Sequence, residues 1–173
     1  GNMGLMLQPY WSPGVRDPGR EAKGALIGFG DVHGRPHVYR AIVEGLMYAL
    51  KDSAGRIERR AKTRLRRLRV SGGGAQSDAV VQIAADVFDL TVERPHTTET
   101  SGLGAAICAA VGLGLHPDFR TAVTKMTRVG ATVTPDSTSA ALYHRLFTRV
   151  YQPLYAQLQP LYRDIRDITG YPR

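Results

Sequence analysis

Three consecutive glycines, Gly72–Gly74, stand where a short apolar strand gives way to a helix whose first residues are Ser77 and Asp78. Backbone without side chains can approach a flat ligand closely, and the N–H groups at a helix start attract anionic groups. The residue types and their order therefore favour a nucleotide site. Three glycines in a row more often form only a tight connection, and on the residues alone that alternative stays open.

Two familiar phosphate-binding motifs do not describe this stretch. No Lys-Ser or Lys-Thr pair follows the glycines, so they do not form a Walker A loop. The G-x-G-x-x-G spacing of dinucleotide-binding proteins is also missing. A nucleotide site here would have to hold its ligand in another way.

A second group of polar residues lies earlier in the chain. His33 and His37 are four residues apart and could bind a metal ion from one helix face. No third ligand is evident and a proline lies between them, so structural hydrogen bonds are the favoured interpretation. Glu44 lies inside an apolar helix, where a buried carboxylate needs a partner, and Arg35 and Arg40 are the obvious candidates.

The segments that would position these residues alternate between strand and helix. Strands are predicted at 24–30, 67–71 and 90–95, with a further one near 127–135. Apolar residues at helical spacing predict helices at 37–62, 77–89, about 101–114, 117–125 and 138–168, the last kinked or divided by Pro153 and Pro160. Residues 8–24, dense in proline, glycine and charge, are typical of an irregular surface loop. This order predicts a layered α/β domain.

Composition limits the class of protein. The 173 residues, of which 43% are hydrophobic, suffice for one globular domain. A single cysteine, Cys108, excludes a disulfide framework and favours the reducing cytoplasm. The alanine-rich stretch around Cys108 is too short to cross a bilayer and is expected to form a helix packed on all sides. The opening residues do not resemble a signal peptide, so neither export nor membrane insertion is expected.

The positive charge is concentrated in one segment. The net charge is +8, and residues 56–69 hold eight basic side chains and one acid. An apolar stripe at three- and four-residue spacing is formed by Ile57, Ala61, Leu65 and Leu68. It predicts an amphipathic helix that runs into a strand, with the arginines on its solvent-exposed face. Because no aromatic side chains are interleaved with the arginines, nucleic acid is not the expected partner. Contact with an acidic partner or with another part of the protein is the alternative to a solvated face.

A resemblance to a known family rests on five segments that together cover nearly the whole chain. They are "GLMLQPYWSPG", "AKGALIGFGDVHGRPHVYRAIVEGLMYAL", "LRVSGGGAQSDAVVQIAADVFDLTVERP", "ETSGLGAAICAAVGLG" and "MTRVGATVTPD". In these segments the sequence resembles the C-terminal domain of the FGGY carbohydrate kinases. The second segment contains the family's His-x-Arg-x-His-x-x-Arg-Ala-x-x-Glu-Gly pattern, here His33, Arg35, His37, Arg40, Ala41, Glu44 and Gly45.

The resemblance implies a fold and an activity. The fold would be an α/β half of the ribonuclease H-like, actin-like ATPase kind, with a mixed sheet flanked by helices. Residues 1–173 would form a partial C-terminal domain that lacks the sugar-binding N-terminal domain. The intact enzyme would be cytoplasmic and would transfer the γ-phosphoryl group of Mg-ATP to a sugar or polyol hydroxyl.

The resemblance also implies the roles of the glycine turn. Gly72, Gly73 and Gly74 would form the wall against which adenine and ribose lie, with Gly73 and Gly74 against the purine. Ser77 matches a position from which a polar side chain reaches the base, and Gln76 is a weaker candidate. Mg²⁺ would be held mainly by ATP and the missing domain, so no catalytic or metal-binding residue is expected in this chain. The stretch that holds Asp31 and His33 would be scaffold.

The partners follow from what the chain lacks. The family's Asp-x-Gly-Thr phosphate hairpin and its aspartate base are not found, so the chain alone is expected to be inactive. ATP would bind here, and the sugar or polyol would bind through the absent domain. No nucleic-acid or membrane partner is expected, and a tyrosine and leucine stripe on the last helix is either core or a homodimer face. The alternative from another class is a stand-alone nucleotide-binding or partner-docking module without kinase activity.

Overall fold

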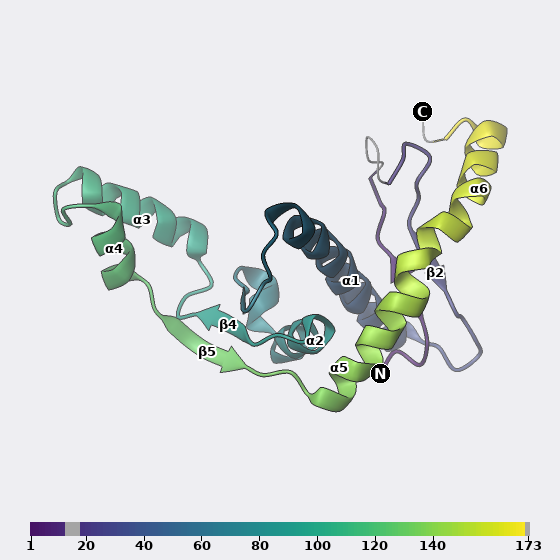
Figure 1. Ribbon diagram of the computed structural model, residues 1–173, viewed down its shortest axis with the longest axis horizontal. Coiled ribbons are helices and arrows are strands. Elements are labelled where there is room, and N and C mark those ends of the chain that lie inside the picture. The colour runs from purple at the N-terminus through teal and green to yellow at the C-terminus, as the bar shows by residue number, and fades with distance from the viewer. Residues whose placement is uncertain (13–17, 172–173) are drawn as a thin grey trace. The chain divides into compact units, whose positions relative to one another are not determined.

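The computed structural model describes residues 1–12 and 18–171, so part of the expected loop at 8–24 lies outside the described residues (Figure 1). The chain divides into two compact units. The first comprises Gly1–Arg64 and Thr138–Arg173, and the second comprises Leu65–Ser137. The first unit contains a two-stranded sheet, β1–β2, and the second a three-stranded sheet with the order β3-β4-β5.

The sheet of the first unit packs against one long helix. Strand β1 (Met6–Gln8) pairs antiparallel with β2 (Ala25–Ile27), and α1 spans Arg35–Ala61. The two backbones approach closely, because a Cβ atom added at Gly45 would lie 2.6 Å from the carbonyl oxygen of Leu7. Only glycine permits this approach. Strand β2 and α1 confirm the predictions, whereas β1 was not predicted.

A buried carboxylate ties α1 to two other segments of the first unit. Glu44 Oε1 accepts hydrogen bonds from Arg40 Nε at 2.7 Å and from the Tyr143 hydroxyl at 2.8 Å. Asn2 Nδ2 donates to Glu44 Oε2 at 2.6 Å. Burial, and then the charge of Glu44, raise the pKa of Tyr143 to about 12. The expected pairing of Glu44 with an arginine is confirmed for Arg40.

The helix predicted at 138–168 is three segments. Helix α5 (Ser137–Leu146) continues through a π-helical turn, η2 (Phe147–Tyr151), into α6 (Gln152–Thr169). Pro153 is the second residue of α6 and follows directly after η2, and Pro160 lies inside the helix. The division therefore falls just before Pro153 rather than at Pro160.

The inner part of this helical series is core. The ring of Tyr48 lies with its centroid 6.0 Å from that of Phe147 and 5.2 Å from that of Tyr151. Tyr143, Leu154 and the residues of this ring cluster are buried. Tyr162 near the end of α6 is also buried, whereas Leu161, Ile165 and Ile168 are exposed. The core interpretation of the tyrosine and leucine stripe therefore holds for its buried members and not for Leu161.

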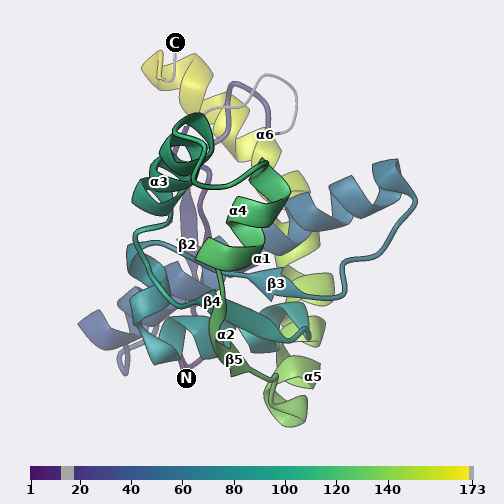
Figure 2. The same ribbon diagram turned by 90° about the vertical axis from the view of Figure 1, so that its left-hand side faces the viewer.

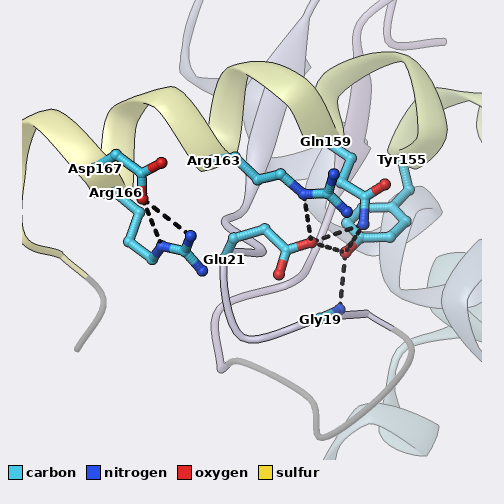
Figure 3. A network of polar contacts seen from close by, with 7 residues as sticks. All are labelled: Gly19, Glu21, Tyr155, Gln159, Arg163, Arg166 and Asp167. Atoms are coloured by element: carbon cyan, nitrogen blue, oxygen red, sulfur yellow. Dashed lines mark hydrogen bonds and ion pairs between the residues drawn. The ribbon is translucent and has the colours of Figure 1, made fainter.

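A polar network fastens the segment before β2 to α6 (Figure 3). The Tyr155 hydroxyl accepts from the backbone N–H of Gly19 at 2.8 Å and donates to Glu21 Oε1 at 3.0 Å. Gln159 Nε2 donates to the same oxygen at 2.7 Å, and Arg163 lies 4.0 Å from it. Hydrogen bonds from its own backbone N–H and from Gln159 lower the pKa of Glu21.

This lowered pKa predicts an acid-sensitive contribution to stability. The contribution of Glu21 is fully present above the ordinary glutamate pKa of 4.5 and is lost as the pH falls through the lowered value. Urea unfolding at a series of acidic pH values should therefore show a steeper loss of stability for the wild type than for Glu21→Gln. Asp167→Asn, which removes an exposed carboxylate from the same helix (Figure 3), is the control. Equal slopes for wild type and Glu21→Gln would contradict the assignment.

The second unit is built on a mixed sheet. Strand β3 (Leu68–Arg69) is parallel to β4 (Val92–Pro95), which is antiparallel to β5 (Val129–Val133). Helix α2 (Asp78–Phe88) lies against β4 and β5 (Figure 2). The predicted strands and helix are all found, with shorter strands than expected.

The alanine-rich helix is not packed on all sides. Helix α3 (Thr100–Gly112) lies beside α4 (Phe119–Met126), and only Ile107 and Ala110 of α3 are buried. Cys108 is exposed. The expectation of a fully enclosed helix is therefore wrong for this chain, because α4 covers only one side of α3. Among the described residues no helix is long and apolar enough to cross a membrane.

The arginine-rich segment is helical only in its first part. Helix α1 ends at Ala61, and Lys62 has φ 50°, so the predicted amphipathic helix does not continue to the next strand. Further along, Arg67 and Arg69 pair with Glu93 on β4 at 3.1 and 2.6 Å. These hydrogen bonds, that of Arg69 above all, lower the pKa of Glu93.

Candidate functional site

The five residues predicted to form the site lie in one continuous turn after β3. Gly72 precedes a short 3₁₀ helix, η1 (Gly73–Gln76), and Ser77 caps α2. The Ser77 side-chain oxygen accepts from the backbone N–H of Val80 at 3.4 Å. The turn lies at the carboxyl end of a parallel strand, where ligands of open α/β sheets usually bind.

The three glycines are not equivalent. Gly72 has φ 84°, a conformation that side-chain-bearing residues rarely adopt, so the turn itself requires this glycine. Gly73 and Gly74 do not have a positive φ. A Cβ atom at either position would meet nothing within 4 Å in the described part of the chain. Neither backbone strain nor packing of these residues explains why positions 73 and 74 lack side chains.

One arginine holds the turn in place. Arg94 on β4 donates from Nη1 to the carbonyl oxygen of Ala75 at 3.1 Å, and its Nη2 pairs with the carboxylate of Asp78. Ala75 is fully buried. Arg94 was missed from the sequence, although a basic residue inside a predicted strand was an available signal. It acts as a positioning residue for η1.

Loss of Arg94 should loosen the turn. Arg94→Met leaves the buried carbonyl of Ala75 without its donor, which costs about 1–3 kcal/mol. Hydrogen exchange of the amides of residues 75–77 should accelerate more than that of amides in β5. Arg128→Met, which removes an exposed arginine of the same unit, is the control. Unchanged exchange at the turn in Arg94→Met would show that Arg94 does not hold it.

The polar side chains of the turn are accessible. Gln76 and Ser77 are exposed, and neither carries a charge. A hydroxyl that accepts from a backbone N–H can still donate its own proton, and an amide both donates and accepts. The turn can therefore recognise a neutral planar group by contact and hydrogen bonds rather than by charge.

A hollow of about 430 Å³ begins next to the glycine turn in the second unit. It lies at the carboxyl ends of β3 and β4, where the hydroxyls of Ser71 and Thr100 are 3.3 Å apart. Leu103 and Ile107 of α3 and Val123 of α4 form apolar parts of its wall. This hollow could not be predicted from the sequence, because its walls come from segments with no shared motif.

The two histidines are held by backbone groups. His33 Nδ1 accepts from the Gly30 N–H at 2.8 Å, and its Nε2 lies 3.1 Å from the carbonyl oxygen of Met3. His37 Nδ1 accepts from the Gly34 N–H at 3.0 Å. These are the structural hydrogen bonds that the spacing favoured. Within residues 1–12 and 18–171, no group of three histidine, cysteine, aspartate or glutamate side chains could hold a metal ion.

Comparison with known proteins gives a consistent result. The family model described as "FGGY family of carbohydrate kinases, C-terminal domain" matches residues 2–113. A xylulose kinase of Staphylococcus epidermidis is 34% identical over 172 residues, which are 98% of this chain and 34% of that protein. The L-xylulose/3-keto-L-gulonate kinase of Escherichia coli is 36% identical over 151 residues, 87% of this chain and 30% of that protein. The crystal structure of xylulose kinase from Rhodospirillum rubrum superposes with a TM-score of 0.74 and 30% identity, over 94% of this chain and 32% of that one.

The chain belongs to the FGGY family of carbohydrate kinases, as a C-terminal domain. The structural likeness confirms the expected fold class, an α/β half of the actin-like ATPase kind with a mixed sheet and flanking helices. The chain spans about a third of the length of the curated relatives it matches. The comparisons give no support to the alternative of a stand-alone module.

Proposed function

We propose that the chain, over residues 1–173, is the partial ATP-binding domain of a kinase that phosphorylates a sugar or polyol hydroxyl. The observation that carries the proposal is the open backbone at Gly73 and Gly74, which neither strain nor packing requires. The purine ring would lie flat against these two residues, while Gly72 makes the turn. Ser77, and more weakly Gln76, would hydrogen-bond to the edge of the base.

The residues near the turn do not fit a magnesium site of their own. Asp78 is the carboxylate in the turn region, and its oxygen already pairs with Arg94. Mg²⁺ prefers several oxygen ligands in octahedral arrangement, including phosphate oxygens and water. Mg²⁺ would therefore be held by ATP and by groups outside this chain.

The acceptor would be bound by the rest of the polypeptide. Relatives are named for xylulose, 3-keto-L-gulonate and glycerol, all of which carry hydroxyl groups. Phosphoryl transfer requires both reactants to be held in line with their charge neutralised. A chain that offers only the adenosine side of a cleft is therefore expected to be inactive alone. Its lone exposed thiol, Cys108, fits a cytoplasmic enzyme.

The exposed end of α6 fits a homodimer contact. Leu161, Ile165 and Ile168 follow one another at spacings of four and three residues and are all exposed. That spacing forms one apolar stripe along a helix. We include a homodimer through this stripe in the proposal.

The test compares two proteins. The full-length protein should form ADP with one of xylulose, 3-keto-L-gulonate or glycerol, and residues 1–173 alone should form none with any of them. Coupled-enzyme assays of ADP release measure both. Turnover by the isolated chain would contradict the proposed division of roles. A full-length protein that neither turns over nor binds ATP in calorimetry would contradict the kinase assignment itself.

A further inference from the structure

A second hollow, of about 680 Å³, lies entirely in the first unit. One face of the last turns of α1 forms part of its wall, and the loop after α1 and one residue of α5 complete it. Its lining residues are Lys51, Gly55, Glu58, Arg59, Lys62, Thr63, Arg64 and His144. Nothing in the proposed nucleotide site involves these residues.

The hollow is strongly positive. Four of its lining side chains are lysine or arginine, and Glu58 is the one acid among them. Other cations of the arginine-rich segment are neutralised elsewhere, Arg56 by Asp52 and Arg69 by Glu93. In contrast, Arg59, Lys62 and Arg64 have no carboxylate partner among the described residues. Positive charges gathered in a concavity raise the local concentration of anions.

At two positions of the hollow, the residue present is not the one that the local backbone conformation favours. Gly55 lies inside α1, and a Cβ atom there would meet Arg59 Nη1 at an ordinary 3.5 Å and no other side chain among residues 1–12 and 18–171 within 4 Å. Alanine would therefore fit and would favour the helix. Lys62 ends α1 with φ 50°, a conformation in which glycine is the preferred residue. Departures from local preference without a packing reason are expected at functional sites.

We propose that this hollow binds a small polyanion that carries two or more phosphate groups. Its volume falls within the range of small-molecule pockets. Arginine guanidinium groups bind phosphate oxygens in pairs and lysine adds a point charge, a combination suited to phosphate. The lining contains no aromatic ring on which a base could stack, which disfavours a nucleic-acid strand.

The test uses inorganic tripolyphosphate as the probe, titrated into the full-length protein in a calorimeter without magnesium at physiological salt. Saturable binding at one site is expected, and it should persist in Gly74→Val, which blocks the proposed adenine wall. Lys62→Gln/Arg64→Gln should weaken binding by at least ~10-fold. The matched control, Arg60→Gln/Arg145→Gln, removes the same charge from neighbours of the lining residues and should change affinity less than about 3-fold.

A third variant separates binding from folding. Gly55→Leu places a side chain in the hollow and also favours the helix, so it should abolish binding without lowering the melting temperature. Wild-type affinity in Gly55→Leu would overturn the proposal, as would an equal loss in both double variants. Tighter binding of a glutamate-rich peptide than of tripolyphosphate would replace the small ligand with an acidic protein partner and would also overturn it.

Discussion

Gly74→Val should raise the KM for ATP of the full-length enzyme by about 10-fold or more, equivalent to at least ~1.4 kcal/mol, with little change in melting temperature. The backbone at Gly74 is not in the left-handed region, and a Cβ atom there meets nothing within 4 Å among the described residues. Valine should therefore be accommodated by the fold. Its methyl groups would stand where the face of the purine is proposed to lie.

Gly72→Val is the matched control, because its φ of 84° makes a side chain unfavourable there. That variant should lose about 1–3 kcal/mol of stability through backbone strain. Steady-state kinetics at varied ATP and saturating acceptor, paired with melting curves, separate the two effects. If Gly74→Val melts early yet binds ATP normally when folded, residues 72–77 form only a turn and the nucleotide site must lie elsewhere.

Glu44→Leu should destabilise the first unit by about 3 kcal/mol. The change leaves the Tyr143 hydroxyl, the Arg40 guanidinium and the Asn2 amide without their common acceptor. Part of the loss is offset because the Arg40 side chain is 39% exposed and can turn to water. Urea unfolding followed by circular dichroism measures the change in the free energy of unfolding.

A double-mutant cycle between Glu44→Leu and Tyr143→Phe tests the cause. The double variant should lose less free energy of unfolding than the sum of the two single variants, because with Phe at 143 no hydroxyl is left without its acceptor. Strict additivity would show that the contact between Glu44 and Tyr143 contributes nothing to stability. Wild-type stability in Glu44→Leu would show the same for the whole network.

The sequence predicts the long elements because their periodicity is strong. The apolar stripe of α1 and the serine cap of α2 are local signals, and both helices are found. Strand β1 was not predicted, because all three of its residues are buried and give no alternation, and its last residue opens the segment interpreted as an irregular loop. Helix α3 consists almost wholly of small and apolar residues, so its sequence cannot indicate which side is covered.

The candidate site likewise has parts that the sequence predicts and parts that it does not. The glycine turn was found from residue types alone, since strand, glycines and helix cap are contiguous. Which of the three glycines in the turn the backbone requires depends on φ, and of these three only Gly72 has a positive value. Arg94 contacts Ala75 across 19 residues, and Tyr143 contacts Glu44 across 99, so no local pattern could predict either contact. The partner four residues away, Arg40, was predictable from helical spacing.

The π-helical turn η2 sets the rotation about the helix axis between residues of α5 and residues of α6. Tyr143 and Tyr155 are 12 positions apart in the sequence, which places two residues of a continuous α-helix about 120° apart around its axis. One residue inserted as a π-bulge reduces that difference to about 20°. The turn at Phe147–Tyr151 thereby lets both tyrosines face the same side, where each hydroxyl donates to a different carboxylate, Glu44 and Glu21. A single extra residue is thus accommodated without losing either anchor point. Conversion of η2 to regular α-helix at unchanged length would rotate α6 until only one of them could form, whereas a one-residue deletion that leaves an unbroken α-helix would keep the difference at about 20° and preserve both.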